Sequence, residues 1–180
     1  MAELEYFTEL PAANGPSRPR LDVFGNPLRC GFGVFTRNHR RHLDEAVALC
    51  LSDSGRRVAF RSAKRWTSAG TAVEFGVIVP VYMAAVGGTG VEYVAELVEL
   101  QLDPHDGDPT TMRLLTLSTA STQGERLWST RARGRSVGTL YVLERVRLVT
   151  PFPISKLKKA MGGRLDENYR YSYALVKPMD

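Results

Sequence analysis

The chain has 180 residues, of which 43% are apolar and 24% charged, and these values are ordinary for a folded globular domain. Its two cysteines are too few for a disulfide framework or a zinc site, and no apolar run approaches the ~20 residues that a membrane-spanning helix needs. The first residues lack the cationic start and apolar core of a secretory signal. The sequence therefore predicts a cytoplasmic protein with reduced thiols, no metal, no cofactor and no membrane partner.

Charge is unevenly distributed along the chain, although the net charge is only +5 and the sequence pI is about 9.4. Residues 37–65 carry eight Lys or Arg against three acids, and residues 126–159 carry nine against Glu144 alone. Residues 92–108, between them, carry six acids and no Lys or Arg. This segregation predicts one positive and one negative face, and a positive face attracts phosphates. A basic surface that is merely solvated is the alternative.

The first regular element that the pattern predicts is a helix over residues 38–51. Residues 1–20 precede it as an extended arm, because they contain several prolines and show no sustained period. Asn38 can cap the helix, and a Ser-Gly pair at residues 54–55 can end it. Apolar side chains recur at helical spacing along it, at Leu43, Val47, Cys50 and Leu51.

Strands dominate the rest of the chain, because apolar residues alternate or run continuously between clusters of Gly, Pro and Asp. We expect strands at residues 57–62, 74–85, 91–102, 125–133, 139–149 and 169–176, and short helices at residues 111–117 and 155–161. A glycine-rich turn at residues 87–90 and loops at residues 103–109 and 131–138 separate them.

This order of elements predicts the fold class. Five or more strands with two or three short helices between them indicate an α+β domain, built as a small, partly open β-barrel with short flanking helices. No segment repeats with a period of ~20–50 residues, so a repeat architecture is not expected. Residues 21–180 should form this one domain.

No group of residues has the spacing of a catalytic or metal centre. His39 and His42 are not joined by a cysteine pair or a His-x-x-x-His motif. Glu92, Glu96 and Glu99 lie near one another, but no lysine follows them as in metal-dependent nucleases. The glycine-rich turn lacks the Gly-Lys-Ser/Thr of a phosphate loop, and no Gly-x-Ser-x-Gly motif is present. The sequence therefore predicts a protein that is not an enzyme.

Aromatic and cationic residues are interleaved in two segments. Residues 60–66 combine two aromatic rings with three cations, and Trp128 has arginines on both sides. An unpaired base is held by stacking on aromatic rings, by polar contacts to its edge and by cations on the flanking phosphates. The alternative is that both tryptophans are core residues whose basic neighbours reach water.

The interleaved segments and the other basic residues give a set of candidate contacts. The residues predicted to contact a nucleobase are Phe60, Ser62, Trp66, Tyr82 and Trp128. The residues predicted to contact phosphates are Arg37, Arg40, Arg41, Arg61, Lys64, Arg65, Arg131 and Arg133.

Four segments of the chain resemble motifs that occur together in one known family. Residues 139–158 are similar to a late strand that ends in a proline-containing segment before a short helix. Residues 56–62 resemble an earlier strand, residues 91–104 resemble the following strand with its Asp-Pro pair, and residues 36–41 resemble the entry to the first helix. The order of these motifs over residues 36–160 resembles that of the EVE-type domains, although about thirty residues separate two strands that are usually close in that family.

The resemblance implies the PUA-like fold that EVE-type domains share with ASCH and YTH domains. It also implies a non-catalytic reader that holds a modified nucleobase in an aromatic-lined pocket by base flipping, with DNA favoured over RNA. Such domains occur as specificity modules of modification-dependent restriction systems. The nuclease would then be a separate domain or chain.

Two other functions stay open at this stage. A small nuclease or RNA-modifying enzyme would require a cluster of acids and a lysine on one sheet face. A protein-interaction or dimerisation domain could use residues 74–98 as a sheet edge or as a dimer contact. Salt dependence separates phosphate binding from protein interaction, because phosphate binding weakens steeply as salt rises.

Overall fold

The structure is a computed structural model that describes residues 19–122, 130–131, 135–136, 138–167, 169, 171 and 173–179. The strands are β1 (Gly33–Asn38), β2 (Arg57–Ser62), β3 (Val79–Ala85), β4 (Gly90–Leu102), β5 (Thr130–Arg131), β6 (Arg135–Ser136), β7 (Thr139–Pro153) and β8 (Tyr173–Val176). The helices are α1 (Arg40–Ser52), α2 (Thr67–Glu74), α3 (Pro109–Leu115) and the 3-10 helices η1 (Ala120–Thr122) and η2 (Ile154–Lys156). Within the described part of the chain, no helix combines the length and the apolar character that crossing a membrane requires.

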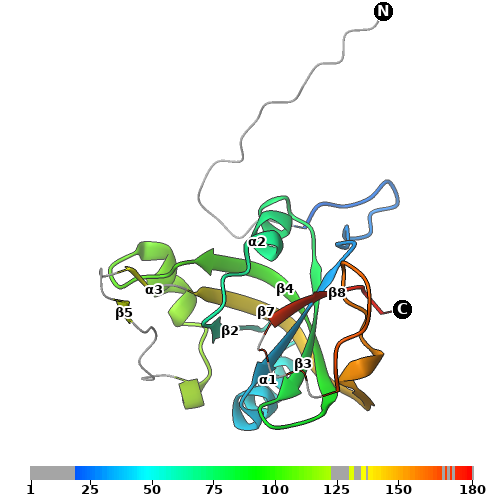
Figure 1. Cartoon of the computed structure of the whole chain (residues 1–180). Coiled ribbons are helices and arrows are strands. Elements are labelled where there is room, and N and C mark those ends of the chain that lie inside the picture. Colours follow the sequence, from blue (N-terminus) through cyan, green and yellow to red (C-terminus); the bar gives the residue numbers. More distant parts are fainter. Residues whose placement is uncertain are drawn as a thin grey trace, which may run out of the picture.

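Six strands form one twisted sheet in the order β2-β7-β4-β3-β1-β8, and β5 pairs with β6 separately (Figure 1). β1 and β3 run parallel, and α1, β2 and α2 supply the crossover connection that a parallel pair needs. Every other pairing in the sheet is antiparallel. No strand pairing among the described residues joins the edge strands β2 and β8, so the sheet is open. The predicted mixture of strands and short helices is confirmed in this coarser form.

The prediction that residues 74–98 offer a sheet edge is wrong. β3 lies between β1 and β4, and β4 lies between β3 and β7. A strand with a partner on each side has no free row of N–H and C=O groups to offer another chain. These two strands therefore build the interior of the sheet.

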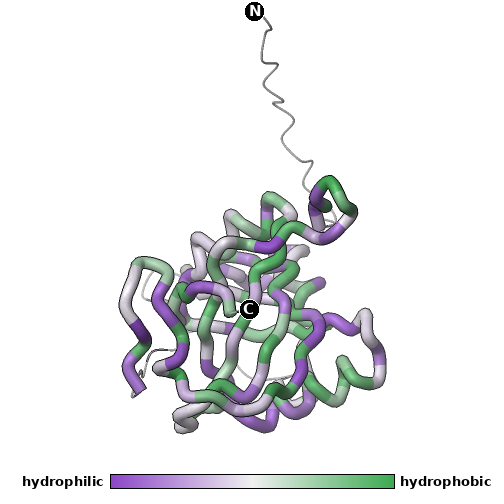
Figure 2. Tube along the Cα trace, turned by 90° about the vertical axis from the view of Figure 1, so that its right-hand side faces the viewer, coloured by the Kyte–Doolittle hydropathy of each residue, from purple (hydrophilic) through white to green (hydrophobic). Residues whose placement is uncertain are grey.

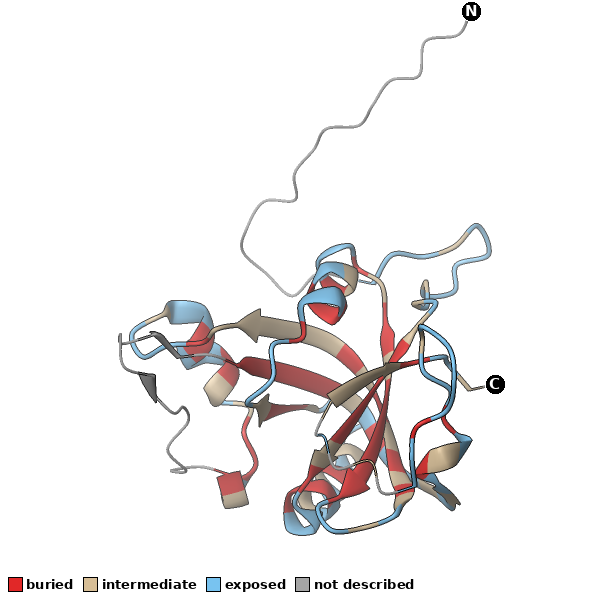
Figure 3. Cartoon of the chain, viewed as in Figure 1, coloured by how far each residue is buried: buried red, intermediate tan, exposed pale blue. Residues whose placement is uncertain are grey.

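Helices α1 and α2 cover one face of the sheet and form the main core with it. α1 contributes Leu43, Ala46 and Val47, which share one helical face, and α2 contributes Ala69 and Val73. Strands β2, β3 and β4 send alternate residues into this core, and those of β4 are Tyr93, Ala95 and Leu97. Figure 3 shows the buried positions on the strands and on the inward sides of these helices.

Four aromatic rings stack at the centre of this core, in the order Phe60, Tyr141, Trp66 and Tyr173. The ring centroids of Trp66 and Tyr141 are 4.1 Å apart, those of Trp66 and Tyr173 5.2 Å, and those of Phe60 and Tyr141 5.8 Å. Trp66 and Tyr141 have no exposed surface, and Phe60 is 2% exposed. Each such pair adds about 0.5–1.5 kcal/mol of stability beyond the burial of its area.

The other face of the sheet carries two smaller clusters, one toward each end. One packs under the C-terminal segment, residues 152–179, and the other packs under α3. Figure 1 shows α3 on the left and the orange-to-red C-terminal segment on the right. Along β4, Val94 belongs to the first cluster and Val98 to the second, whereas Glu96 between them belongs to neither. The middle of this face is therefore left open.

Most of the predicted elements are confirmed, with small changes at their ends. α1, β2, β4, α3 and β7 lie where the pattern places them. α3 begins where the Asp108 carboxylate accepts a hydrogen bond of 2.7 Å from the backbone N–H of Thr111. The predicted cap of α1 is wrong, because His39 takes the N-cap position and the Asn38 side chain donates to the Tyr141 hydroxyl instead.

Two predicted elements differ in kind from the structure. Residues 74–85 do not form one strand, because α2 ends at Glu74 and a turn with Gly76 precedes β3. The helix expected at residues 155–161 is reduced to η2, and β7 continues through Pro151 and Pro153. Proline has no N–H to donate to a neighbouring strand. The two prolines are tolerated because this end of β7 pairs only with β4 and no strand on its other side needs a donor. The strand expected at residues 125–133 falls mostly outside the described residues.

We expect the buried phenol of Tyr141 to make the fold sensitive to alkali. Burial raises the pKa of Tyr141 to about 12, although a 2.9 Å hydrogen bond from Asn38 acts in the opposite direction. An unfolded tyrosine ionises near pH ~10, so this contribution to stability is complete below that pH and is lost between about 10 and 12. Burial also raises the pKa values of Tyr93 and Tyr173 to about 12.

Tyr141→Phe should therefore lose less stability than the wild type when the pH is raised from neutral to a value between about 10 and 12. Urea unfolding at both pH values measures it. Part of the loss should remain in this variant, because the raised pKa values of Tyr93 and Tyr173 also make stability fall in this interval. A variant with an unchanged alkaline loss would contradict the buried phenol.

Candidate functional site

The open part of the second sheet face contains a groove with a volume of about 430 Å³, called here the sheet-face groove. Strands β3, β4 and β7 supply most of its lining, and Arg29 and Met179 complete it. Figure 2 shows the C-terminal end of the chain near the middle of the view. Met179, close to that end, packs against the cluster on this face of the sheet. The polar and aromatic lining residues are Arg29, Tyr82, Glu96, Arg145, Arg147 and Phe152.

A β-bulge in β7 brings Arg145 to this groove. Leu143 and Val146 both enter the main core, so two residues, Glu144 and Arg145, stand between core positions where a regular strand has one. Arg145 absorbs the extra length with a φ of 54°, which is uncommon for a residue with a side chain. Bulges of this kind re-aim side chains and are frequent beside functional sites.

Three arginines and one carboxylate line the sheet-face groove. The Glu96 side chain is 12% exposed, and its oxygens lie 3.1 Å from Nη2 of Arg29 and 3.4 Å from Nη1 of Arg145. Arg147 is exposed and has no hydrogen-bond or ion-pair partner among the described residues. A guanidinium carries five N–H donors, so Glu96 leaves most of those on Arg29 and Arg145 unused. The groove is net positive and offers donors to an anion.

The two aromatic residues of the groove have different roles. The hydroxyl of Tyr82 accepts a 2.6 Å hydrogen bond from the backbone N–H of Met179, and only 6% of Tyr82 is exposed. Tyr82 therefore ties the C-terminal segment to the sheet. Phe152 is half-buried, and Nζ of Lys156 lies 5.6 Å from its ring centroid. Phe152 is the ring that a flat ligand can reach.

This arrangement can hold a planar polar ligand that carries a phosphate. A base can lie against Phe152, and a phosphate can accept hydrogen bonds from Arg147. Each oxygen of Glu96 keeps a second lone pair, so this carboxylate can also accept a hydrogen bond from the amino group of a base.

The residues predicted to stack on a base occupy other places. Trp66 is not placed to contact a base as predicted, because it stands at the N-cap of α2 with its indole fully buried, and Phe60 stacks in the same core. An indole with no exposed surface has no face to offer a base. The Ser62 hydroxyl accepts from the backbone N–H of Lys64 at 3.1 Å. Trp128 lies outside the described residues.

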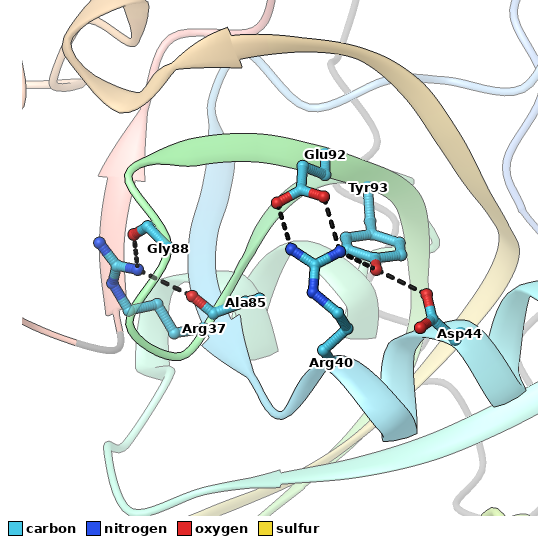
Figure 4. Close-up of polar contacts among 7 residues, drawn as sticks. All are labelled: Arg37, Arg40, Asp44, Ala85, Gly88, Glu92 and Tyr93. Carbon is cyan, nitrogen blue, oxygen red and sulfur yellow. Dashed lines mark hydrogen bonds and ion pairs between the residues drawn. The ribbon is translucent and has the colours of Figure 1, made fainter.

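Two of the arginines predicted to bind phosphate are engaged within the fold (Figure 4). Arg37 donates to the backbone carbonyls of Ala85, Gly88 and Tyr169 at 2.6–3.3 Å, and its desolvation lowers the pKa of its guanidinium. Arg37, which is half-buried, thus fastens the glycine-rich turn between β3 and β4.

Arg40 forms a bidentate ion pair with Glu92, in which Nη1 and Nη2 donate to the two carboxylate oxygens at 2.7 and 2.6 Å. It also donates to the hydroxyl of Tyr93, which in turn donates to Asp44 at 2.6 Å. The hydrogen bonds between the two side chains raise the pKa of Arg40 and lower that of Glu92. A phosphate at Arg40 would have to displace Glu92 (Figure 4).

The remaining predicted phosphate contacts are scattered. Arg41 donates to Nε2 of His42 at 3.1 Å, and Arg61 donates to the carbonyl of Thr122 at 3.1 Å. Arg65 pairs with Asp103 at 2.9 Å, while Lys64 is exposed. The side chain of Arg131 and the whole of Arg133 lie outside the described residues. Of the predicted contacts that the structure describes, only Tyr82 lines the sheet-face groove.

Sequence reasoning missed the arginines of the groove, although a signal for two of them was present. Arg145 and Arg147 belong to the basic segment at residues 126–159 and stand at non-core positions of a well-predicted strand. Arg29 precedes β1 with no pattern around it, and only the fold brings it to Glu96.

Among the described residues, no group of three or more His, Cys, Asp or Glu is placed to hold a metal ion. Comparisons with protein-family models, with curated proteins and with solved structures give no match. The geometry and charge of the site therefore carry the functional argument.

Proposed function

We propose that this chain is a nucleic-acid-binding module that holds an unpaired nucleotide in the sheet-face groove. The observation that carries the proposal is the meeting of three arginines and the half-buried ring of Phe152 in one groove. Its volume of about 430 Å³ lies in the range of small-ligand sites. Basic groups bind the phosphates of nucleic acids, and aromatic rings stack on unpaired bases.

Each groove residue has a distinct role in this proposal. Arg147 binds the phosphate, because its guanidinium is exposed and has no partner among the described residues. Phe152 stacks on the base, and Glu96 accepts from its amino group while Arg29 and Arg145 hold the carboxylate in place. A base with an exocyclic amino group should therefore bind better than one without it.

The finer part of the proposal is a PUA-like domain that reads a modified nucleobase in DNA. The resemblance of residues 36–160 to EVE-type domains supports it, and the groove residues then take the place of Trp66 as the base-reading group. The domain would serve as the specificity module of a modification-dependent restriction system. Its nuclease would be a separate domain or chain.

Arg147→Gln should weaken binding of a single-stranded oligonucleotide of ~10 nucleotides by about tenfold, the worth of one charge-assisted hydrogen bond. It should also flatten the dependence of log affinity on log salt by about 0.7, because one phosphate contact is lost. Arg40→Gln is the matched control. It removes the same charge from a side chain that Glu92 already pairs, so its affinity should stay close to wild type.

Fluorescence anisotropy of a labelled oligonucleotide at several salt concentrations measures both quantities. Arg147 is exposed, so its replacement should leave the melting temperature unchanged. If a well-folded Arg147→Gln variant keeps wild-type affinity for the oligonucleotide while Arg40→Gln binds it more weakly, the binding surface lies outside the sheet-face groove.

A further inference from the structure

A second groove, of about 370 Å³, lies in the C-terminal segment and is called here the lysine groove. Four cationic side chains line it, together with Pro178 and Met179: Lys156, Lys158, Arg164 and Lys177. All four are exposed, and none has a carboxylate partner among the described residues. No acidic residue of the described part of the chain belongs to this lining.

Backbone pairing fixes the cations of the lysine groove in place. The N–H of Lys177 donates to the carbonyl of Lys158 at 2.8 Å, and Lys158 forms an antiparallel bridge with Arg164. The N–H of Lys159 closes the turn between them by donating to Gly163 at 2.8 Å. The charges therefore belong to paired segments rather than to a free tail. Cations held together without acids repel one another, and a bound polyanion relieves this repulsion.

The lysine groove adjoins the sheet-face groove. Met179 lines both grooves, and its backbone N–H is bonded to Tyr82. Phe152 lines the sheet-face groove, while Lys156, whose Nζ lies over that ring, lines the lysine groove. A ligand that extends past Phe152 or Met179 therefore enters the lysine groove.

We infer that the lysine groove is a phosphate track, which binds the backbone of the same strand whose nucleotide occupies the sheet-face groove. This inference rests on the proposed function. Its described lining residues include four cations but no aromatic ring and no acid, so we expect it to contact phosphates without reading bases. A nucleic-acid strand fits a concave groove that continues into a site of nucleotide size.

The test uses the full chain and a triple variant of the lysine groove, Lys158→Gln, Arg164→Gln and Lys177→Gln, called here the lysine triple. Its affinity for a single strand of ~10 nucleotides should fall about ten- to hundredfold. The salt slope should flatten by about two, because three contacts are lost at about 0.7 each. Binding of a nucleoside monophosphate should not change, because that ligand reaches only the sheet-face groove.

A matched triple variant removes the same charge elsewhere: Arg56→Gln, Lys64→Gln and Arg113→Gln. These side chains are exposed and line neither groove, so affinity for the strand should stay within about twofold of wild type. Thermal melts of both triple variants check that the fold is kept. Equal weakening by the two triples would mean that only net charge matters, and would overturn the track.

The outcomes separate this inference from the function on which it rests. Suppose that the lysine triple loses strand binding and that Arg147→Gln weakens binding of both the strand and the nucleoside monophosphate. This result supports both the phosphate track and the nucleotide site. A lysine triple with the wild-type salt slope overturns the track and leaves the sheet-face groove untouched. If strand binding is weakened by the lysine triple but not by Arg147→Gln, the nucleotide site is excluded and the phosphate track is supported. Binding of vesicles containing anionic lipid, without binding of the strand, overturns the inference.

Discussion

Trp66→Ala is expected to lower the free energy of unfolding by about 3–5 kcal/mol, the usual cost of removing a large aromatic side chain from a core. The indole has no exposed surface and stacks on Tyr141 and Tyr173, with centroid distances of 4.1 and 5.2 Å. Its removal leaves both rings facing a cavity that packed neighbours fill only in part. Urea unfolding of the wild type and the variant gives the difference.

Two further variants make this result specific to the core. Trp66→Phe keeps a ring in the stack, and Nε1 of Trp66 has no partner among the described residues, so no hydrogen bond is lost. It should cost clearly less than the alanine variant. Phe24→Ala removes a ring that is 85% exposed and should change stability by no more than about 0.5 kcal/mol. A Trp66→Ala variant with wild-type stability would contradict the core placement.

The same variant tests which residues read the base. Under conditions where Trp66→Ala is folded, its affinity for a single strand should equal that of the wild type, because Trp66 and the sheet-face groove lie on opposite faces of the sheet. A large loss of affinity in the folded variant would instead return Trp66 to the binding site.

Strands with one face in the core could be predicted, because their side chains alternate directly along the sequence. β4 and β2 show this alternation, with Val58 and Phe60 pointing into the main core. β3 lies in the middle of the sheet and is apolar on both faces, so it shows no alternation. The small residues of α2, including Ala69 and Gly70, give only a weak helical period. The sequence therefore predicted neither α2 nor the boundary between α2 and β3.

The candidate site was harder to predict, because it depends on contacts between distant residues. Lys64 and Arg65 make the surroundings of Trp66 polar in the sequence. However, the backbone N–H of Trp66 donates to Oγ1 of Thr139 at 3.0 Å, which turns the indole inward against β7. Local composition carries no trace of this contact. Arg29 likewise reaches Glu96 only because it bridges to Ile78, just before β3, and β3 pairs with β4.

Gly138→Ala is the second change that we expect to be costly, at about 3 kcal/mol of stability. Gly138 has a φ of +155°, where residues with a side chain are rare, and a Cβ there would lie 2.5 Å from the backbone oxygen of Ser62. The next residue, Thr139, pairs with Ser62 in the sheet, so neither strand can move away alone. Gly31→Ala is the control, because its Cβ would meet no atom within 4 Å.

The two costly positions should also be coupled through Thr139. Oγ1 of Thr139 accepts from the N–H of Trp66 and donates to the carbonyl of Lys64 at 2.8 Å, so a shift at Gly138 loosens the anchor of the indole. The double variant Gly138→Ala/Trp66→Phe should therefore cost less than the sum of its single changes, by about 0.5 kcal/mol or more. Urea unfolding of the four proteins completes this cycle. Strict additivity would show that Gly138 does not act on the core through Thr139.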